Sequence, residues 1–65
     1  MSKYEWGYIP EYINYAATSA LGMKLGFIEK PKSQDEYCIM YADYLISDYV
    51  SSCPNWMDSL EERPK

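Results

Sequence analysis

The chain has 65 residues, of which 48% are hydrophobic and 17% aromatic. This makes one small domain and excludes intrinsic disorder, which requires few aromatic residues and a high net charge. The net charge is −4. An acidic chain gains no binding free energy from the release of counterions from nucleic acid, so direct nucleic-acid binding is not expected. A chain this short buries only about 60% of its unfolded surface, and small domains commonly gain further stability from disulfides, a metal or a partner chain.

The start of the chain and its most apolar run predict neither export nor membrane insertion. The stretch MSKYEWGY lacks the apolar core of a signal peptide. The run from Ala16 to Ile28 is short and contains Lys24, so it does not predict a membrane span. Cys38 and Cys53 would lie about 22 Å apart on one helix, too far for a disulfide. Two reduced cysteines predict a cytoplasmic protein.

The first eight residues are the first feature in chain order. Tyr4, Trp6 and Tyr8 occupy alternate positions, a pattern typical of a strand. A lone strand has no pairing partner in a helical protein. We therefore expect residues 1–8 to form an extended aromatic arm that packs across the helices.

A first helix is predicted over residues 10–25. Pro10 suits the first helical position, where its missing N–H is not needed, and Gly26 suits the left-handed residue that closes a helix. Gly22 and Gly26 also form a G-x-x-x-G pair, which we interpret as a tolerated glycine and a helix end. The apolar stripe of this helix, at helical spacing, consists of Ile9, Ile13, Ala16, Ala20, Met23 and Phe27.

Pro31 separates this segment from a second helix, predicted over residues 34–52. Ser33 and Glu36 have the spacing of a capping box, in which each side chain accepts a hydrogen bond from the backbone N–H of the other residue. Pro54 ends or kinks this helix. The stripe that would face the first helix consists of Cys38, Ala42, Leu45, Ile46, Tyr49 and Cys53.

After Pro54, a short third helix is predicted over residues 55–62, anchored by Trp56, Met57 and Leu60. Residues 63–65 are expected to form a loose tail. The predicted fold class is therefore all-α, an antiparallel helical hairpin within a single small domain. Two such hairpins would pair in a homodimer as a four-helix arrangement, the simplest closed assembly.

A second apolar face on the second helix is the main functional signal. It is formed at spacing i, i+3, i+4, i+7 by Tyr37, Met40, Tyr41 and Tyr44. A hairpin buries only one face of a helix, so either the chain's own termini or a partner must cover this one. Tyrosine buries a large area while its hydroxyl tolerates water, and it is enriched at interfaces. We therefore predict a protein–protein interface at these four residues.

The sequence offers no reactive constellation. It contains no histidine, which removes the commonest general base and the commonest metal ligand. The two cysteines have no further ligands at a zinc-binding spacing. Asp43 and Asp48 do not share a helical face, and the lysines of KPKS at 30–33 are a weak phosphate signal. We expect no enzymatic activity, no cofactor, no metal and no small-molecule substrate.

Three stretches give the chain a recognisable general character: the Met-Ser-Lys start, the capped linker KPKSQDE and the segment YCIMYADYLISDY. In this it resembles the small, acidic, helical accessory proteins encoded in the early regions of temperate, lambdoid-type bacteriophages. The resemblance spans the whole chain without a diagnostic motif, so it transfers no functional residue. It implies a protein that works in the bacterial host cytoplasm and modulates a host or phage protein by binding.

The predicted function is a non-enzymatic protein–protein interaction module that self-associates or docks onto a larger protein. The alternative is a transcription-related regulator that acts on a DNA-binding protein or polymerase. That alternative relies on the acidic half of the chain, where residues 33–65 contain seven acidic and two basic side chains. A basic groove on the partner would then attract this half, and added salt would weaken the complex.

Overall fold

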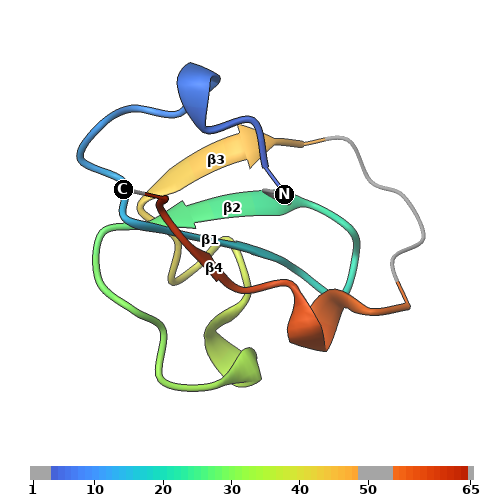
Figure 1. The fold of residues 1–65 in the computed structure, drawn as a ribbon. Coiled ribbons are helices and arrows are strands. Elements are labelled where there is room, and N and C mark those ends of the chain that lie inside the picture. Colours follow the sequence, from blue (N-terminus) through green and yellow to red (C-terminus); the bar gives the residue numbers. More distant parts are fainter. Residues whose placement is uncertain (1–3, 49–53, 65) are drawn as a thin grey trace.

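The computed structural model describes residues 4–48 and 54–64. In these ranges it contains four strands in one antiparallel sheet and three 3-10 helices in the connections. The sheet order is β3-β2-β1-β4, so the last strand returns beside the first (Figure 1). The elements in chain order are η1 (Trp6–Tyr8), β1 (Tyr15–Thr18), β2 (Lys24–Phe27), η2 (Gln34–Glu36), β3 (Tyr44–Ser47), η3 (Trp56–Asp58) and β4 (Glu61–Glu62).

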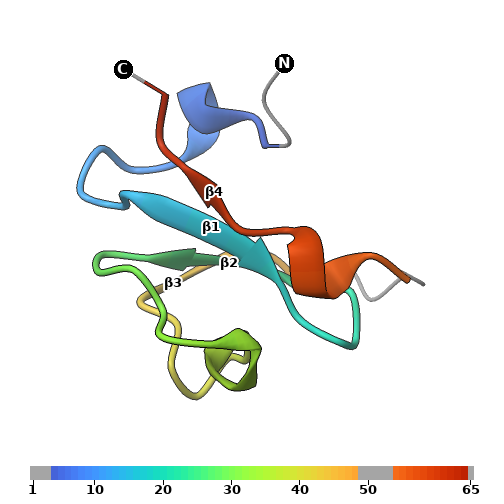
Figure 2. The same ribbon diagram turned by 60° about the horizontal axis from the view of Figure 1, so that its bottom comes forward.

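The two faces of the sheet carry separate apolar clusters, because successive side chains of a strand point to opposite faces. On the face that we call the arm face, the buried residues are Tyr4, Ile9, Ile13 and Ala16, with Trp6, Tyr44 and Ile46 packed against them. On the other face, called the loop face, they are Ala17, Leu25, Phe27 and Tyr37, with Tyr15, Met23, Ala42, Trp56 and Leu60 packed against them. Figures 1 and 2 show residues 4–13, which we call the arm from here on, on one side of the sheet and residues 28–43 on the other. Irregular segments therefore cover both faces of the sheet, a role that helices have in many small domains.

The β1–β2 hairpin depends on a tight turn at residues 19–22. The Gly22 N–H donates to the Ser19 carbonyl at 2.9 Å, and Gly22 has a φ of 94°. Glycine adopts this left-handed conformation without a steric penalty, and a turn of this kind is a common hairpin connection. The Ser19 hydroxyl also accepts from the N–H groups of Leu21 and Met23, each at 3.2 Å. Gly22 is thus a turn residue.

Gly26 is required for a different reason, the close approach of a side chain. Its φ is not positive, but a Cβ added there would lie 2.8 Å from Cγ2 of Ile13 and 3.4 Å from Cβ of Tyr44. Ile13 is fully buried and packs directly on the β2 backbone at this point. The missing side chain lets the arm lie flat against the sheet.

Arg63 holds the same arm from the C-terminal end of the chain. Its Nε donates to the Ile13 carbonyl at 2.8 Å, and its Nη2 donates to the carbonyls of Ile9 at 3.2 Å and Pro10 at 2.5 Å. Its guanidinium carbon also lies 4.8 Å from the ring centroid of Trp6. Three backbone carbonyls of the arm are therefore satisfied by one side chain.

A buried hydrogen-bond network ties the arm to the segment that precedes β4. The Tyr4 hydroxyl donates to the Ser59 carbonyl at 2.9 Å and lies 3.0 Å from Oγ1 of Thr18. The Ser59 hydroxyl accepts from the Thr18 N–H at 2.7 Å and donates to the Trp56 carbonyl at 2.6 Å. These buried polar groups therefore have partners, as buried polar groups require.

The predicted all-α fold is wrong, and with it the antiparallel helical hairpin. Residues 10–25 form a turn, strand β1, the hairpin turn and the start of β2 instead of a helix. The wheel stripe that predicted the helix is divided between the two faces of the sheet: Ala16 lies in the arm-face cluster, Phe27 lies in the loop-face cluster, and Ala20 is exposed. Pairing with distant strands outweighs the small differences in local helix propensity.

The second and third predicted helices are also wrong in the described residues. Within 34–52, residues up to Asp48 form η2 and β3, and the remaining residues lie outside the described ranges. Within 55–62 the chain forms η3 and β4. The capping box becomes a tight turn in which Glu36 Oε1 accepts from the Lys32 N–H at 2.9 Å, with no side-chain cap from Ser33. Without helices to pack, the four-helix homodimer has no basis.

The cysteine argument changes for the same reason, since it assumed that both residues share a helix. Cys38 is a free, half-buried cysteine just after η2. Cys53 lies outside the described residues. The helical separation of the two sulfurs therefore no longer applies.

The contact between Gly26 and Ile13 makes the first prediction. Gly26→Ala should lower the free energy of unfolding by about 1–3 kcal/mol, because overpacking a tight core forces the backbone and Ile13 apart. Gly7→Ala is the matched control, since a Cβ there would meet nothing within 4 Å. Urea denaturation measures both variants, and equal stability of the two would contradict the packing argument.

Arg63 makes the second prediction. Arg63→Met should cost about 2 kcal/mol of unfolding free energy, through the loss of the hydrogen bonds and of the contact with Trp6. Arg63→Lys should recover only part of this loss, because an ammonium group cannot reproduce the guanidinium fork. Lys30→Met removes an exposed cation as a control. Denaturation followed by tryptophan fluorescence checks all three, and a loss as large in Lys30→Met would show a general charge effect.

Candidate functional site

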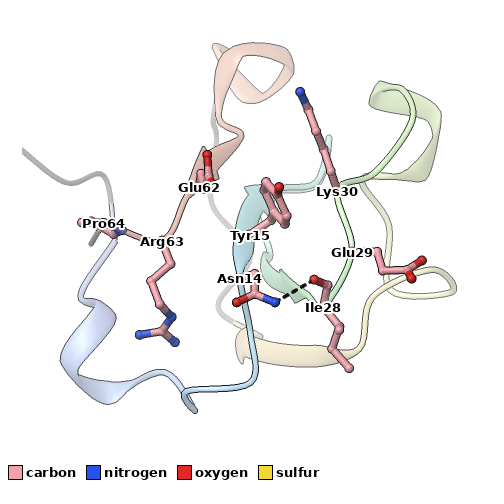
Figure 3. Close-up of a pocket in the computed structure, with 8 residues that line it drawn as sticks. All are labelled: Asn14, Tyr15, Ile28, Glu29, Lys30, Glu62, Arg63 and Pro64. Atoms are coloured by element: carbon pink, nitrogen blue, oxygen red, sulfur yellow. Dashed lines mark hydrogen bonds between the residues drawn. The ribbon is translucent and has the colours of Figure 1, made fainter.

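A groove of about 600 Å³ opens between β1, residues 28–30 and residues 62–64. Figure 3 shows that its charged side chains do not converge: Lys30 and Glu29 point in different directions, and the Arg63 guanidinium points towards the arm. The Asn14 amide donates to the Ile28 carbonyl at 3.0 Å. Arg63 is committed to the carbonyls of the arm, so the groove presents no acid–base pair aimed at a common point. We assign it no chemistry.

Two further findings concern the described part of the chain. Residues 4–48 and 54–64 contain no cluster of three or more histidine, cysteine, aspartate or glutamate residues that could hold a metal ion. They also contain no helix long and apolar enough to cross a membrane.

Three consecutive apolar residues project from the connection between η2 and β3. Ile39 is 50% exposed, Met40 86% and Tyr41 57%. A run of three exposed apolar residues contradicts the usual pattern of a solvent-facing segment unless it serves a function. Exposed apolar patches mark interaction sites on small proteins. We call these three residues the apolar tip.

The backbone at the base of the apolar tip is held by several hydrogen bonds. The N–H groups of Tyr41 and Ala42 both donate to the Cys38 carbonyl, at 3.1 and 3.2 Å. The Asp43 N–H donates to the Gly26 carbonyl at 2.9 Å, and the Asp43 carboxylate accepts from the Ile28 N–H at 2.8 Å. The tip is thus exposed at its side chains and anchored at its backbone, which lowers the entropy that a partner must remove on binding.

A second groove, of about 480 Å³, lies beside the apolar tip. Tyr41 and the exposed Ile28 both contribute to its walls. Its charged lining residues carry both signs and are Glu29, Lys30, Lys32, Glu36 and Asp43. An apolar centre beside a polar rim has the anatomy of a protein–protein interface.

The structure separates the four residues that the sequence placed on one face. Met40 and Tyr41 stay together in the apolar tip. Tyr37 is buried in the loop-face cluster, and Tyr44 packs against the arm-face cluster on the other side of the sheet. The chain itself therefore covers two of the three tyrosines, which was one of the two alternatives considered for them.

Two members of the candidate surface were absent from the sequence prediction. Ile39 lies next to Met40 in the tip, and Ile28 belongs to a different part of the chain. The run Ile39–Tyr41, just before Asp43, could have signalled an exposed apolar turn. No signal in the sequence connects Ile28 to this run, because the two are brought together by the pairing of β2 with β3.

Tyr37 anchors the base of the tip to the loop-face core. Its ring meets the edge of Trp56 at 6.3 Å between centroids and an interplanar angle of 75°. Burial raises the pKa of the Tyr37 phenol above its ordinary value of 10.0, and the Asp58 carboxylate raises the pKa further. Both effects disfavour a negative charge on this oxygen.

Comparison of the chain with protein-family models, curated proteins and solved structures found no match. The resemblance to bacteriophage accessory proteins stays a prediction.

Tyr37 makes the third prediction. The pKa of the Tyr37 phenol is raised in the folded state. The contribution of the neutral phenol to the free energy of unfolding is therefore complete below pH 10 and is lost as the pH rises through the folded-state pKa. Stability should therefore fall more steeply above about pH 10 in the native chain than in Tyr37→Phe. Denaturation at several pH values between 8 and 12 measures the difference. Parallel curves would show that Tyr37 titrates equally in the folded and unfolded states.

Proposed function

We propose that this chain is a non-enzymatic protein-binding module whose contact surface is the apolar tip together with the neighbouring side chain of Ile28. The observation that carries the proposal is the exposure of three consecutive apolar side chains on an anchored turn, with Met40 at 86%. Exposed apolar side chains are unfavourable in water, and a partner that buries them gains binding free energy. Burying side chains of this size contributes about 1.5–3 kcal/mol each.

The shape of the surface indicates the kind of partner. The tip protrudes from the 28–43 connection, which lies to one side of the sheet (Figure 2). A protruding tip is complementary to an apolar pocket or groove on a larger protein. Tyrosine supplies a hot-spot residue type and methionine an adaptable one.

The charges around the tip support specificity rather than general attraction. Lys30 and Lys32 stand beside Glu29 and Glu36 along the adjoining groove. Such a mixed rim does not attract one charge sign strongly, but it sets the register of a partner that carries the complementary charges. Binding at the tip should therefore depend only weakly on salt.

The fourth prediction tests this surface with two matched methionines. Met40→Glu should reduce capture of a specific partner at least tenfold, because a charge is placed at the centre of the apolar contact. Met57→Glu is the control, since Met57 is 53% exposed and lies in η3, outside the apolar tip. The native chain and both variants are immobilised, incubated with bacterial lysate and compared by quantitative mass spectrometry.

The two variants separate the possible outcomes. A protein retained by the native chain and by Met57→Glu but lost with Met40→Glu supports the proposal. Equal retention by all three chains, or equal loss with both variants, contradicts a role for the apolar tip. Circular dichroism and denaturation of each variant establish that the fold is kept.

A further inference from the structure

Met40 is the residue of the apolar tip whose side chain a mild oxidant can modify. The side chain of Ile39 is a hydrocarbon, and the phenol of Tyr41 does not react with a peroxide unless a catalyst is present. The thioether sulfur of methionine, in contrast, takes up one oxygen atom to give methionine sulfoxide. Met40 is 86% exposed, so a small solute can reach its side chain from the solvent.

Two other methionines in the described part of the chain are less accessible than Met40. Met57 is 53% exposed in η3. Met23 is half-buried and packs against the loop-face cluster. Because oxidation of a sulfur side chain follows its exposure, Met40 should react first, Met57 second and Met23 last.

The turn that carries Met40 is held by bonds that do not involve its side chain. The N–H groups of Tyr41 and Ala42 donate to the Cys38 carbonyl, and the Asp43 N–H donates to a carbonyl of β2. Oxidation of the Met40 sulfur leaves these bonds in place. A sulfoxide in a packed core disrupts the fold. At this position it changes the surface and keeps the fold.

Oxidation removes the property on which the proposed contact depends. A thioether is apolar, whereas the oxygen of a sulfoxide is a polar hydrogen-bond acceptor. In the free chain, water solvates this oxygen. In an apolar pocket of a partner, the oxygen would be buried without a hydrogen-bond donor, which is unfavourable. Oxidation of Met40 should therefore weaken binding at the tip.

We propose that Met40 is a site of reversible oxidation by a small peroxide, and that this oxidation switches the apolar tip from a binding to a non-binding state. The switch rests on the function proposed above, because it requires a partner at the tip. The preferential oxidation of Met40 does not, because it requires only the exposure of the side chain.

The chemical step balances with hydrogen peroxide as the oxidant. The sulfur lone pair attacks one peroxide oxygen, the S–O bond forms as the O–O bond breaks, and the second oxygen leaves as water. Sulfur loses two electrons, and the peroxide gains them. A thiol-dependent methionine sulfoxide reductase reverses the change. In that step two thiols form a disulfide, and the sulfoxide oxygen leaves as water.

The first experiment measures where the native full chain is oxidised. It is treated with hydrogen peroxide for increasing times, and the sulfoxide content at each methionine is read by peptide mass spectrometry. Met40 should react roughly twice as fast as Met57 and roughly tenfold faster than Met23. Equal rates at Met40 and Met57 would overturn the inference. So would a loss of stability on oxidation that Met40→Leu prevents, because the change would then act on the fold.

The second experiment uses Met40→Leu to separate oxidation at the tip from every other effect of peroxide. Leucine keeps an apolar side chain of similar volume but has no sulfur. The native chain, Met40→Leu and the control Met57→Leu are immobilised and treated with peroxide. Dithiothreitol then returns oxidised cysteines to thiols while methionine sulfoxide persists. Each chain is incubated with bacterial lysate, and the probe is the protein that the native chain retains and Met40→Glu loses.

The expected pattern is a loss of retention that follows the Met40 sulfur. After peroxide, the native chain and Met57→Leu should each retain about fivefold less of the probe protein than before treatment. Met40→Leu should retain the same amount with and without peroxide. Treatment of the oxidised native chain with reductases for both sulfoxide epimers should restore retention.

The failure of this inference differs from the failure of the proposed function. Undiminished retention by the oxidised native chain, an equal loss with Met40→Leu, or no recovery after reduction would overturn the inference and leave the proposed function in place. Retention of every captured protein by Met40→Glu would instead reject the proposed function, and the switch with it.

Discussion

The hydrogen bonds from the Arg63 guanidinium to the carbonyls of Ile9, Pro10 and Ile13 hold one half of this structure in place. A four-stranded sheet with two apolar faces needs cover on both, and the described residues contain no α-helix to supply it. The arm covers one face only if its irregular backbone is satisfied. Arg63 does this from the far end of the chain, and Gly26 provides the space into which Ile13 fits.

The other face is covered by the 28–43 connection, and this determines where the candidate function lies. Tyr37 enters the core beside Trp56, and Asp43 is bonded to Gly26 and Ile28. Between these two anchors, Ile39, Met40 and Tyr41 face solvent. The same connection leads directly into β3. The position of the apolar tip therefore results from how the loop face is closed.

Part of the candidate site could be predicted from the sequence. The abundance of tyrosine and methionine in 37–44 indicated an interaction surface, and Met40 and Tyr41 do lie exposed together. The helical wheel then grouped them with Tyr37 and Tyr44, which the sheet sends to opposite faces. The helical period of the apolar residues was the wrong prediction, because a sequence rich in Ala, Leu, Met and Tyr fits an apolar helical stripe as well as it fits two short strands. Glycines at 22 and 26 were the local evidence against a helix.

The sequence by itself determined that the chain is one small, acidic, aromatic-rich domain, and it placed breaks at Pro31 and Pro54. Those properties follow from composition and from the backbone limits of proline, which act locally. Only the tertiary structure decided the fold class, the role of Arg63 and the division of the tyrosines. Each of these depends on contacts between residues far apart in the chain, such as Leu25 with Leu45 and Arg63 with Ile9. Short strands gain their stability from such pairings, which local sequence patterns do not contain.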